Sequence, residues 1–274
     1  SFCGMIVEKR RLPMQYYDQH LHTYFSFDSE EKFENYLAYQ PEFFVSTDHF
    51  DLNNPSTGKD DIPDYPAYIN KLDSLKETYS TKFLRGIEIG VVPGQEERIV
   101  DYLAQHPYDL KLVSIHQNGR FDYMDDVVLT KDPIQTTKEY FDQMLQVLTD
   151  FPEGDILTHF DYGLRRFTFT AEEFAEHFEA QLLTIFKKVV ERELAMELNA
   201  KSFLKYGNED LYRYAVPLYQ SVGGKLFTLG SDAHVAEDYQ LGFKKMSQLL
   251  ADCQVEKLLV IQGKERRLTP LPIL

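Results

Sequence analysis

The sequence predicts an α/β barrel built from seven strand–helix units. Seven short apolar runs alternate with segments that carry helical signals, which is the order typical of a parallel sheet. Each apolar run ends on a polar residue, and six of the eight histidines lie at those ends. Active sites of such barrels lie at the carboxyl ends of the strands, so the residue pattern agrees with the architecture. An open doubly wound sheet is the alternative, but it would gather its ligands at one switch point.

The predicted strands are short, and their polar endings follow one another along the chain. They span Gln15–His22, Glu42–His49, Lys82–Ile89, Leu110–His116, Asp155–His159, Leu194–Asn199 and Lys225–Ser231. In the first of them, His20 and His22 flank a single leucine. Because side chains two residues apart on a strand share one face, these two imidazoles can hold one metal ion.

Helical signals separate the strands. We expect helices in the segments Ser29–Tyr39, Tyr65–Tyr79, Gly94–His106, Thr136–Thr149, Ala171–Arg192, Asn208–Val222 and Ala236–Asp252. The longest follows Thr170, with Glu173 three residues later, which is a capping-box pattern. Pro217 is expected to kink or end the helix that contains it.

Three further segments are predicted to be irregular. Asn53–Pro66 and Gly119–Pro133 are polar loops, each long enough to lie over a site at the strand ends. The tail Val260–Leu274 contains Pro270 and Pro272, which favour an irregular or edge segment.

Composition and charge narrow the function. The 274 residues, 43% of them hydrophobic, contain no long linker, so we expect one domain over residues 1–274. The net charge of −15 argues against a nucleic-acid partner. No apolar run reaches the roughly 18 residues that a membrane span needs. Cys3 and Cys253 are too few for a disulfide framework, which favours a cytoplasmic protein. The oligomeric state stays open.

The residues at the strand ends are those that bind divalent metals. They are His20, His22, Asp28, His49, Glu88, His116, His159, Asp232 and His234. Imidazole and carboxylate bind zinc, manganese and iron, and this set exceeds the need of one ion, so it predicts two or three. Glu88 would be costly to bury unpaired, whereas a carboxylate can bridge two ions. Ions about 3.5–4 Å apart can share a hydroxide, which is a nucleophile for phosphate esters.

Taken in order, these residues resemble the polymerase-and-histidinol-phosphatase (PHP) superfamily. Its markers are an HxH, an Asp-His pair, a lone Glu, two single His and a closing DxH, and they occur here from Asp18 to His234. The resemblance implies a distorted seven-stranded β/α barrel with three metal ions. It assigns the first ion to His20, His22, Glu88 and Asp232, the second to Glu88, His116 and His159, and the third to Asp28, His49 and His234. Asp28 departs from members that carry His at this place.

Within that superfamily, the chain length and the segment THFDYGLRRF are most similar to the stand-alone histidinol-phosphate phosphatases of histidine biosynthesis. This resemblance implies hydrolysis of L-histidinol phosphate to L-histidinol and phosphate, by a metal-bridging hydroxide that attacks phosphorus. Three alternatives stay open. They are a PHP phosphoesterase for another small ester (a nucleotide, sugar phosphate or aryl phosphate), an amidohydrolase, and a non-catalytic module of a polymerase. Amidohydrolases usually place a modified lysine on strand four, where this chain has His116.

Four further residues are candidates for substrate binding and catalysis. Arg165 and Arg166 follow the fifth predicted strand, and either guanidinium could bind phosphate oxygens with paired hydrogen bonds, with Arg165 slightly favoured. Both could instead be surface residues. Lys201 would add a second cation. Asp161 could donate a proton to the leaving alkoxide, or orient a ligand histidine.

Overall fold

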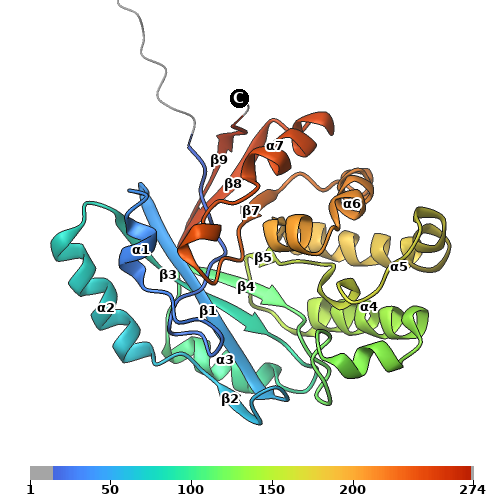
Figure 1. Ribbon diagram of the computed structural model, residues 1–274, viewed down its shortest axis with the longest axis horizontal. Helices are drawn as coiled ribbons and strands as arrows, with labels where there is room; N and C mark the ends of the chain where they lie inside the picture. Colours follow the sequence, from blue (N-terminus) through green and yellow to red (C-terminus); the bar gives the residue numbers. More distant parts are fainter. Residues whose placement is uncertain (1–14, 273–274) are drawn as a thin grey trace, which may run out of the picture.

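Seven strands form one sheet in the order β2–β1–β3–β4–β5–β6–β7 in the computed structural model, which describes residues 15–272 (Figure 1). The strands are β1 (Phe43–Asn54), β2 (Lys59–Asp61), β3 (Lys82–Gly90), β4 (Leu110–Ser114), β5 (Ile156–Leu157), β6 (Ala195–Asn199) and β7 (Phe227–Gly230). All neighbours pair in parallel except β2, which pairs antiparallel with the end of β1. The predicted α/β class with a parallel sheet is confirmed. β2 is a correction, since it lies in a segment predicted to be a loop.

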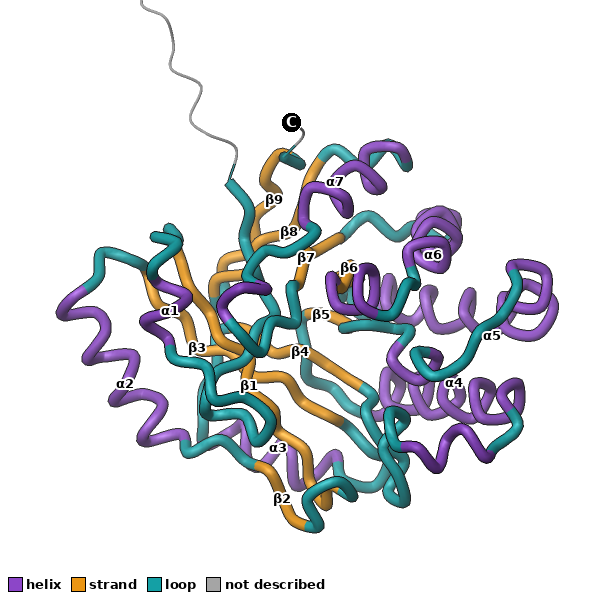
Figure 2. Tube along the Cα trace, in the orientation of Figure 1, coloured by secondary structure: helices purple, strands orange, loops and turns teal. Residues whose placement is uncertain are grey.

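The first predicted strand, residues 15–22, is not a regular strand, and Figure 2 draws it as loop. It nevertheless lies between β7 and β1. The Gln19 amide donates to the Leu229 carbonyl (3.3 Å), and the Thr47 amide donates to the Leu21 carbonyl (2.8 Å). This extended segment therefore bridges the two sides of the sheet at the position of a first barrel strand, although its bonds are too few for a ladder.

Seven α-helices surround the strands among residues 15–272, and each coincides with a segment predicted to be helical, although α4 begins three residues before its predicted segment and ends one residue after it. They are α1 (Phe33–Leu37), α2 (Tyr65–Thr78), α3 (Glu96–Gln105), α4 (Pro133–Asp150), α5 (Ala171–Glu191), α6 (Glu209–Ser221) and α7 (Phe243–Asp252). Figure 1 shows α2 and α3 on one flank of the sheet and α4, α5 and α6 on the other. The predicted capping box of Thr170 and Glu173 is present, and Pro217 lies inside α6 without ending it. Among residues 15–272, no helix has the length and apolarity to span a membrane.

The tail forms an antiparallel hairpin of β8 (Lys257–Gln262) and β9 (Glu265–Pro270), which agrees with the edge alternative of the prediction and not with the irregular one. Leu259, Val260 and Ile261 of β8 are buried in one apolar cluster with residues near the amino ends of the sheet strands. The side-chain amide of Gln19 binds the backbone of β8, since Nε2 donates to the Leu259 carbonyl and Oε1 accepts from the Ile261 backbone amide. The hairpin therefore closes the amino end of the barrel.

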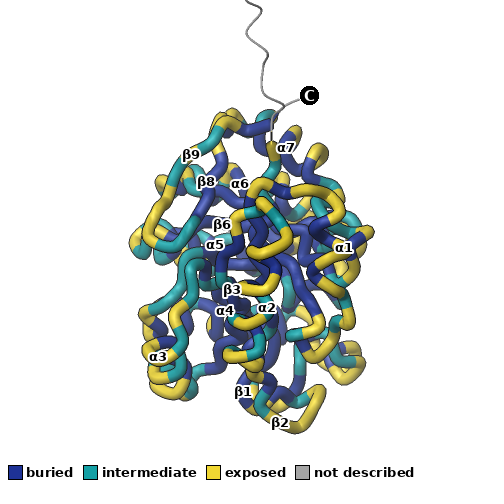
Figure 3. The backbone as a smooth tube through the Cα atoms, turned by 90° about the vertical axis from the view of Figure 1, so that its left-hand side faces the viewer, coloured by how far each residue is buried: buried dark blue, intermediate teal, exposed yellow. Residues whose placement is uncertain are grey.

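Figure 3 shows the buried strands inside a more exposed outer layer, and these strands change from apolar to polar residues along their length. On β3, buried Leu84 precedes buried Glu88, and on β6 buried Ala195 precedes buried Glu197. The two residues of each pair are separated by an even number of positions, so they lie on the same face of their strand. The apolar amino ends of the strands pack on β8, and the polar side chains gather at the carboxyl ends.

Candidate metal centre

Glu88 lies at the middle of the candidate site, on β3, and its side chain is completely buried. Histidine nitrogens approach both of its carboxylate oxygens. Oε2 lies 3.2 Å from His20 Nε2, 3.2 Å from His22 Nε2 and 3.3 Å from His49 Nδ1, and Oε1 lies 3.0 Å from His116 Nε2 and 2.9 Å from His159 Nε2. The chain thus places five imidazoles around one carboxylate at the carboxyl ends of the strands.

The two remaining acidic candidates complete this arrangement. Asp232 follows β7, and its Oδ1 lies 3.4 Å from His22 Nε2 and 3.7 Å from His20 Nε2. Asp28 Oδ2 lies 3.1 Å from His234 Nε2 and 3.4 Å from His49 Nε2 at the more exposed edge. All nine side chains predicted as ligands therefore converge.

Charge explains how the buried acids remain ionised. Burial alone would raise the pKa of Glu88, but the charges of His20, His116 and His49 hold that pKa well below its usual range. In return, Asp51 and Glu88 raise the pKa of His116 to about 10 against the effect of burial. A metal needs neutral imidazoles, so binding ions here would release protons and replace these charges on histidine.

Several buried polar atoms at this point lie near opposite charges, yet none of them makes a hydrogen bond of good geometry within residues 15–272. They are His20 Nε2, His22 Nε2, His49 Nδ1, Asp51 Oδ2 and Glu88 Oε2. A buried polar atom without a partner is costly, and such atoms are rare in folded proteins. The orphaned atoms are imidazole nitrogens and carboxylate oxygens, which are the donors that zinc and related ions prefer. The donor set therefore fits bound divalent metal.

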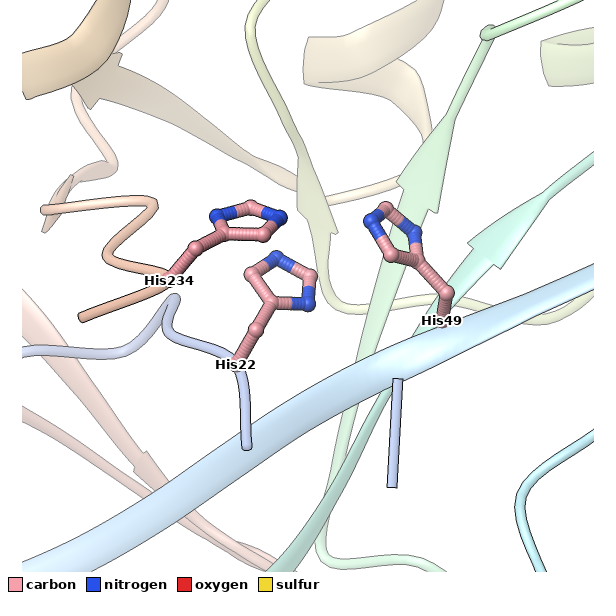
Figure 4. Close-up of side chains that lie close together, drawn as sticks. All are labelled: His22, His49 and His234. Carbon is pink, nitrogen blue, oxygen red and sulfur yellow. The ribbon is translucent and has the colours of Figure 1, made fainter. Parts of the chain in front are cut away.

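The side chains form four overlapping groups, each compact enough to hold one ion. The groups are His22–His49–His234, His20–His159–Asp232, His20–His22–Glu88 and His49–Glu88–His116. Figure 4 shows the first group, in which the ring of His22 lies 4.3 Å from that of His49 and 4.2 Å from that of His234. His22 and His49 each belong to two groups. The geometry therefore brings the predicted ligands together without dividing them into the three sets that the resemblance implied.

A surrounding layer of acceptors, which the sequence analysis missed, fixes the ligand rings. The contacts are His20 Nδ1 to Glu197 (2.6 Å), His116 Nδ1 to Asp51 (3.0 Å) and His22 Nδ1 to Ser26 (3.0 Å). Each such contact sets the ring orientation and the tautomer that faces the centre. Glu197 did carry a signal, because it interrupts the apolar run AMELN as Glu88 interrupts GIEIG.

Arg165 and Lys201 both reach the edge of the centre beside Asp232. Arg165 Nη2 lies 3.5 Å from Asp232 Oδ2, and the guanidinium packs between the rings of Tyr162 (5.0 Å) and Tyr206 (4.7 Å). Lys201 Nζ lies 3.6 Å from Asp232 Oδ1. Lys201 begins a π-helical turn, Lys201–Lys205, a distortion that is frequent at functional sites.

Arg166 bonds to the loop after β4 and to none of the candidate ligands among residues 15–272, so this geometry does not favour its predicted role in substrate binding. Its Nη1 donates to the Met124 carbonyl (2.5 Å), and its Nη2 donates to Asp126 (2.9 Å). The two neighbouring arginines follow a short 3₁₀ turn, Tyr162–Leu164, so they leave the backbone in different directions. Arg166 ties the loop after β4 to the loop after β5.

Asp161 is completely buried and both of its carboxylate oxygens accept hydrogen bonds from other side chains, so the geometry does not favour its predicted role as proton donor. Its Oδ1 accepts from Ser202 Oγ (2.9 Å) and Tyr212 (2.9 Å), and its Oδ2 accepts from Asn208 (2.6 Å). Ser202 Oγ in turn accepts from Arg165 Nη2 (2.8 Å). Asp161 is therefore placed to hold Arg165 through Ser202.

Sequence comparison with known proteins shows similarity to histidinol-phosphatases over most of the chain. No protein-family model matches the chain. It is 27% identical to the histidinol-phosphatase of Lactococcus lactis over 260 residues, which cover 91% of this chain and 96% of the relative. A probable histidinol-phosphatase of Clostridium acetobutylicum is also 27% identical, with 88% of this chain and 94% of the relative covered.

Two solved structures share the fold. The crystal structure of histidinol phosphate phosphatase from Lactococcus lactis, complexed with zinc, L-histidinol and phosphate, gives a TM-score of 0.81 at 26% identity, covering 91% of this chain and 98% of that one. A putative histidinol phosphatase from Listeria monocytogenes gives 0.70 at 17% identity, with 83% and 98% covered, which bears on the fold alone.

Proposed function

We propose that this chain, which shares its fold with the histidinol-phosphatases along 91% of its length, is a metal-dependent phosphomonoesterase that hydrolyses L-histidinol phosphate to L-histidinol and phosphate. The observation that carries the proposal is the buried carboxylate of Glu88 within five imidazoles, in a chain similar to a phosphatase that binds zinc, L-histidinol and phosphate.

Two or three divalent ions, with zinc as the first candidate, would be held by the nine convergent side chains, with Glu88 shared between ions. Such ions lower the pKa of water and neutralise charge on phosphoryl oxygens. The protein itself supplies two cations at the edge of the centre, Arg165 and Lys201, each close to Asp232. Arg165 Nε and Nη2 donate to Ser202 and Asn199, which holds the guanidinium in place. The positive charges of Arg165 and Lys201 are therefore ordered where negative charge would develop during phosphoryl transfer.

The proposed function is tested by steady-state phosphate release, with metal content measured on the same sample. We expect kcat/KM for L-histidinol phosphate to exceed that for sugar phosphates, nucleotides and aryl phosphates, with two or three metals per chain. Chelation should abolish turnover, and zinc, manganese or iron should restore it. A fully reloaded protein that prefers another ester would reject this substrate and keep the phosphoesterase chemistry.

Arg165 and Arg166 make a matched pair for locating the phosphate-binding guanidinium. We expect Arg165→Lys to lower kcat/KM about 10- to 100-fold, because a lysine cannot reproduce the paired hydrogen bonds of a guanidinium. Arg166→Ala should change kcat/KM by less than about threefold, since among residues 15–272 that side chain donates hydrogen bonds to Met124 and Asp126 and to none of the candidate ligands. Steady-state kinetics decide the matter, and a larger loss from Arg166→Ala would reverse the assignment.

A further inference from the structure

Arg165 and Asp122 both contact one tyrosine, Tyr162, through different parts of its side chain. The face of the Tyr162 ring packs on the Arg165 guanidinium (5.0 Å to the ring centroid). The Tyr162 hydroxyl donates to Asp122 Oδ1 (2.9 Å). Tyr162 thus separates a guanidinium from a carboxylate, and the two charges do not pair with each other.

Asp122 lies close to the ligand histidines without being one of the convergent ligands. The Tyr123 amide, next in the chain, donates to the His116 carbonyl (2.9 Å), which folds the loop after β4 back over the centre. The Tyr162 ring that holds Asp122 lies 5.0 Å from the His116 ring and 5.1 Å from the His159 ring. The carboxylate therefore forms part of the wall beside these two histidines.

Only one of the two carboxylate oxygens has a structural task. Oδ1 accepts from Tyr162 and also from the Met124 amide (2.8 Å), which is an Asx turn. None of the hydrogen bonds among residues 15–272 ends on Oδ2. An asparagine would serve the turn and the tyrosine equally well, so the fold alone does not require the negative charge.

That charge has a cost in a phosphatase, because a carboxylate beside the site repels a phosphate dianion. The repulsion becomes attraction if the substrate carries a positive charge on the alcohol side, away from its phosphate. We propose that Asp122 determines specificity by binding a protonated amine of the substrate, so that the site selects phosphate monoesters of amino alcohols. This inference rests on the proposed phosphatase function, and L-histidinol phosphate belongs to the class.

The test compares two esters of equal size that differ in charge, 2-aminoethyl phosphate and n-propyl phosphate, together with L-histidinol phosphate. In Asp122→Asn we expect kcat/KM to fall about 30-fold for the two cationic esters and by less than about threefold for propyl phosphate, at unchanged metal content. L-Histidinol binding, measured by calorimetry without turnover, should weaken by a similar factor. Asp126→Asn removes a charge from the same loop at an exposed side chain and should leave all these values unchanged.

The outcomes separate this inference from the proposed function. Equal losses for the charged and neutral esters, or undiminished binding of L-histidinol to Asp122→Asn, would overturn the role of Asp122. A wild-type enzyme that is poor with L-histidinol phosphate, but prefers aminoethyl phosphate in a manner that needs Asp122, would reject the proposed substrate and support the inference.

Discussion

Glu88→Gln is expected to abolish phosphate release, with a loss of at least about a thousandfold, because the contribution of the metals amounts to several kcal/mol. Glutamine has nearly the same size, so the change removes little more than the negative charge. That charge faces five imidazole nitrogens at 2.9–3.3 Å. A neutral amide cannot bridge two cations as a carboxylate can, so at least one metal should be lost.

Metal content per chain and kcat should be measured together on the purified variant. Glu139→Gln on α4 is the matched control, since this glutamate is exposed and should leave both values unchanged. Circular dichroism verifies that the variant is folded. If the variant bound one fewer metal but kept the wild-type kcat, Glu88 would not be needed for catalysis and the prediction would be wrong.

Gly90→Ala is expected to lower activity about 100-fold, although the change adds only one methyl group outside the ligand set. A Cβ at Gly90 would lie 1.8 Å from Asp51 Oδ1 and 2.9 Å from His116 Nδ1. Asp51 would have to leave His116, and the ring would lose the acceptor that orients it toward Glu88. The expected signs are weaker metal binding and a lower kcat, measured by metal titration and steady-state kinetics.

Gly86→Ala on the same strand is the control for a purely structural clash. Its Cβ would meet the Ser46 carbonyl oxygen at 2.4 Å, away from the ligands. We expect it to lower the free energy of unfolding by about 1–3 kcal/mol without changing the metal affinity of the folded protein. Equal metal affinities in Gly90→Ala and wild type would show that the Asp51–His116 contact does not support the site.

The convergence of the candidate ligands could be predicted from the sequence because it follows from strand geometry. Polar residues at the carboxyl ends of buried parallel strands meet at the same edge of the sheet. His116 and Glu88 could therefore be predicted to converge from their apolar runs alone. Thr170 and Glu173 marked the start of α5 through local chemistry that needs no tertiary contact.

The remaining features depend on contacts between distant segments. Arg165 and Arg166 are identical in sequence terms, and only their partners, Asp232 and Asp126, distinguish them. The tail was predicted from its prolines to be an irregular or edge segment, and its pairing with β8 decides for the edge strand β9, which Pro270 ends and where a missing amide proton costs little. The first segment lacks a ladder because β7 and β1 each offer it only isolated bonds.

The β8–β9 hairpin also decides how molecules move through the enzyme. Leu259, Val260 and Ile261 fill the amino end of the barrel. The site around Glu88 is therefore closed at that end. Substrate and both products have to pass by the carboxyl ends of the strands, where the candidate ligands lie. Phosphate that remains bound at Arg165 would therefore block binding of the next substrate molecule, so product release has to precede each new turnover.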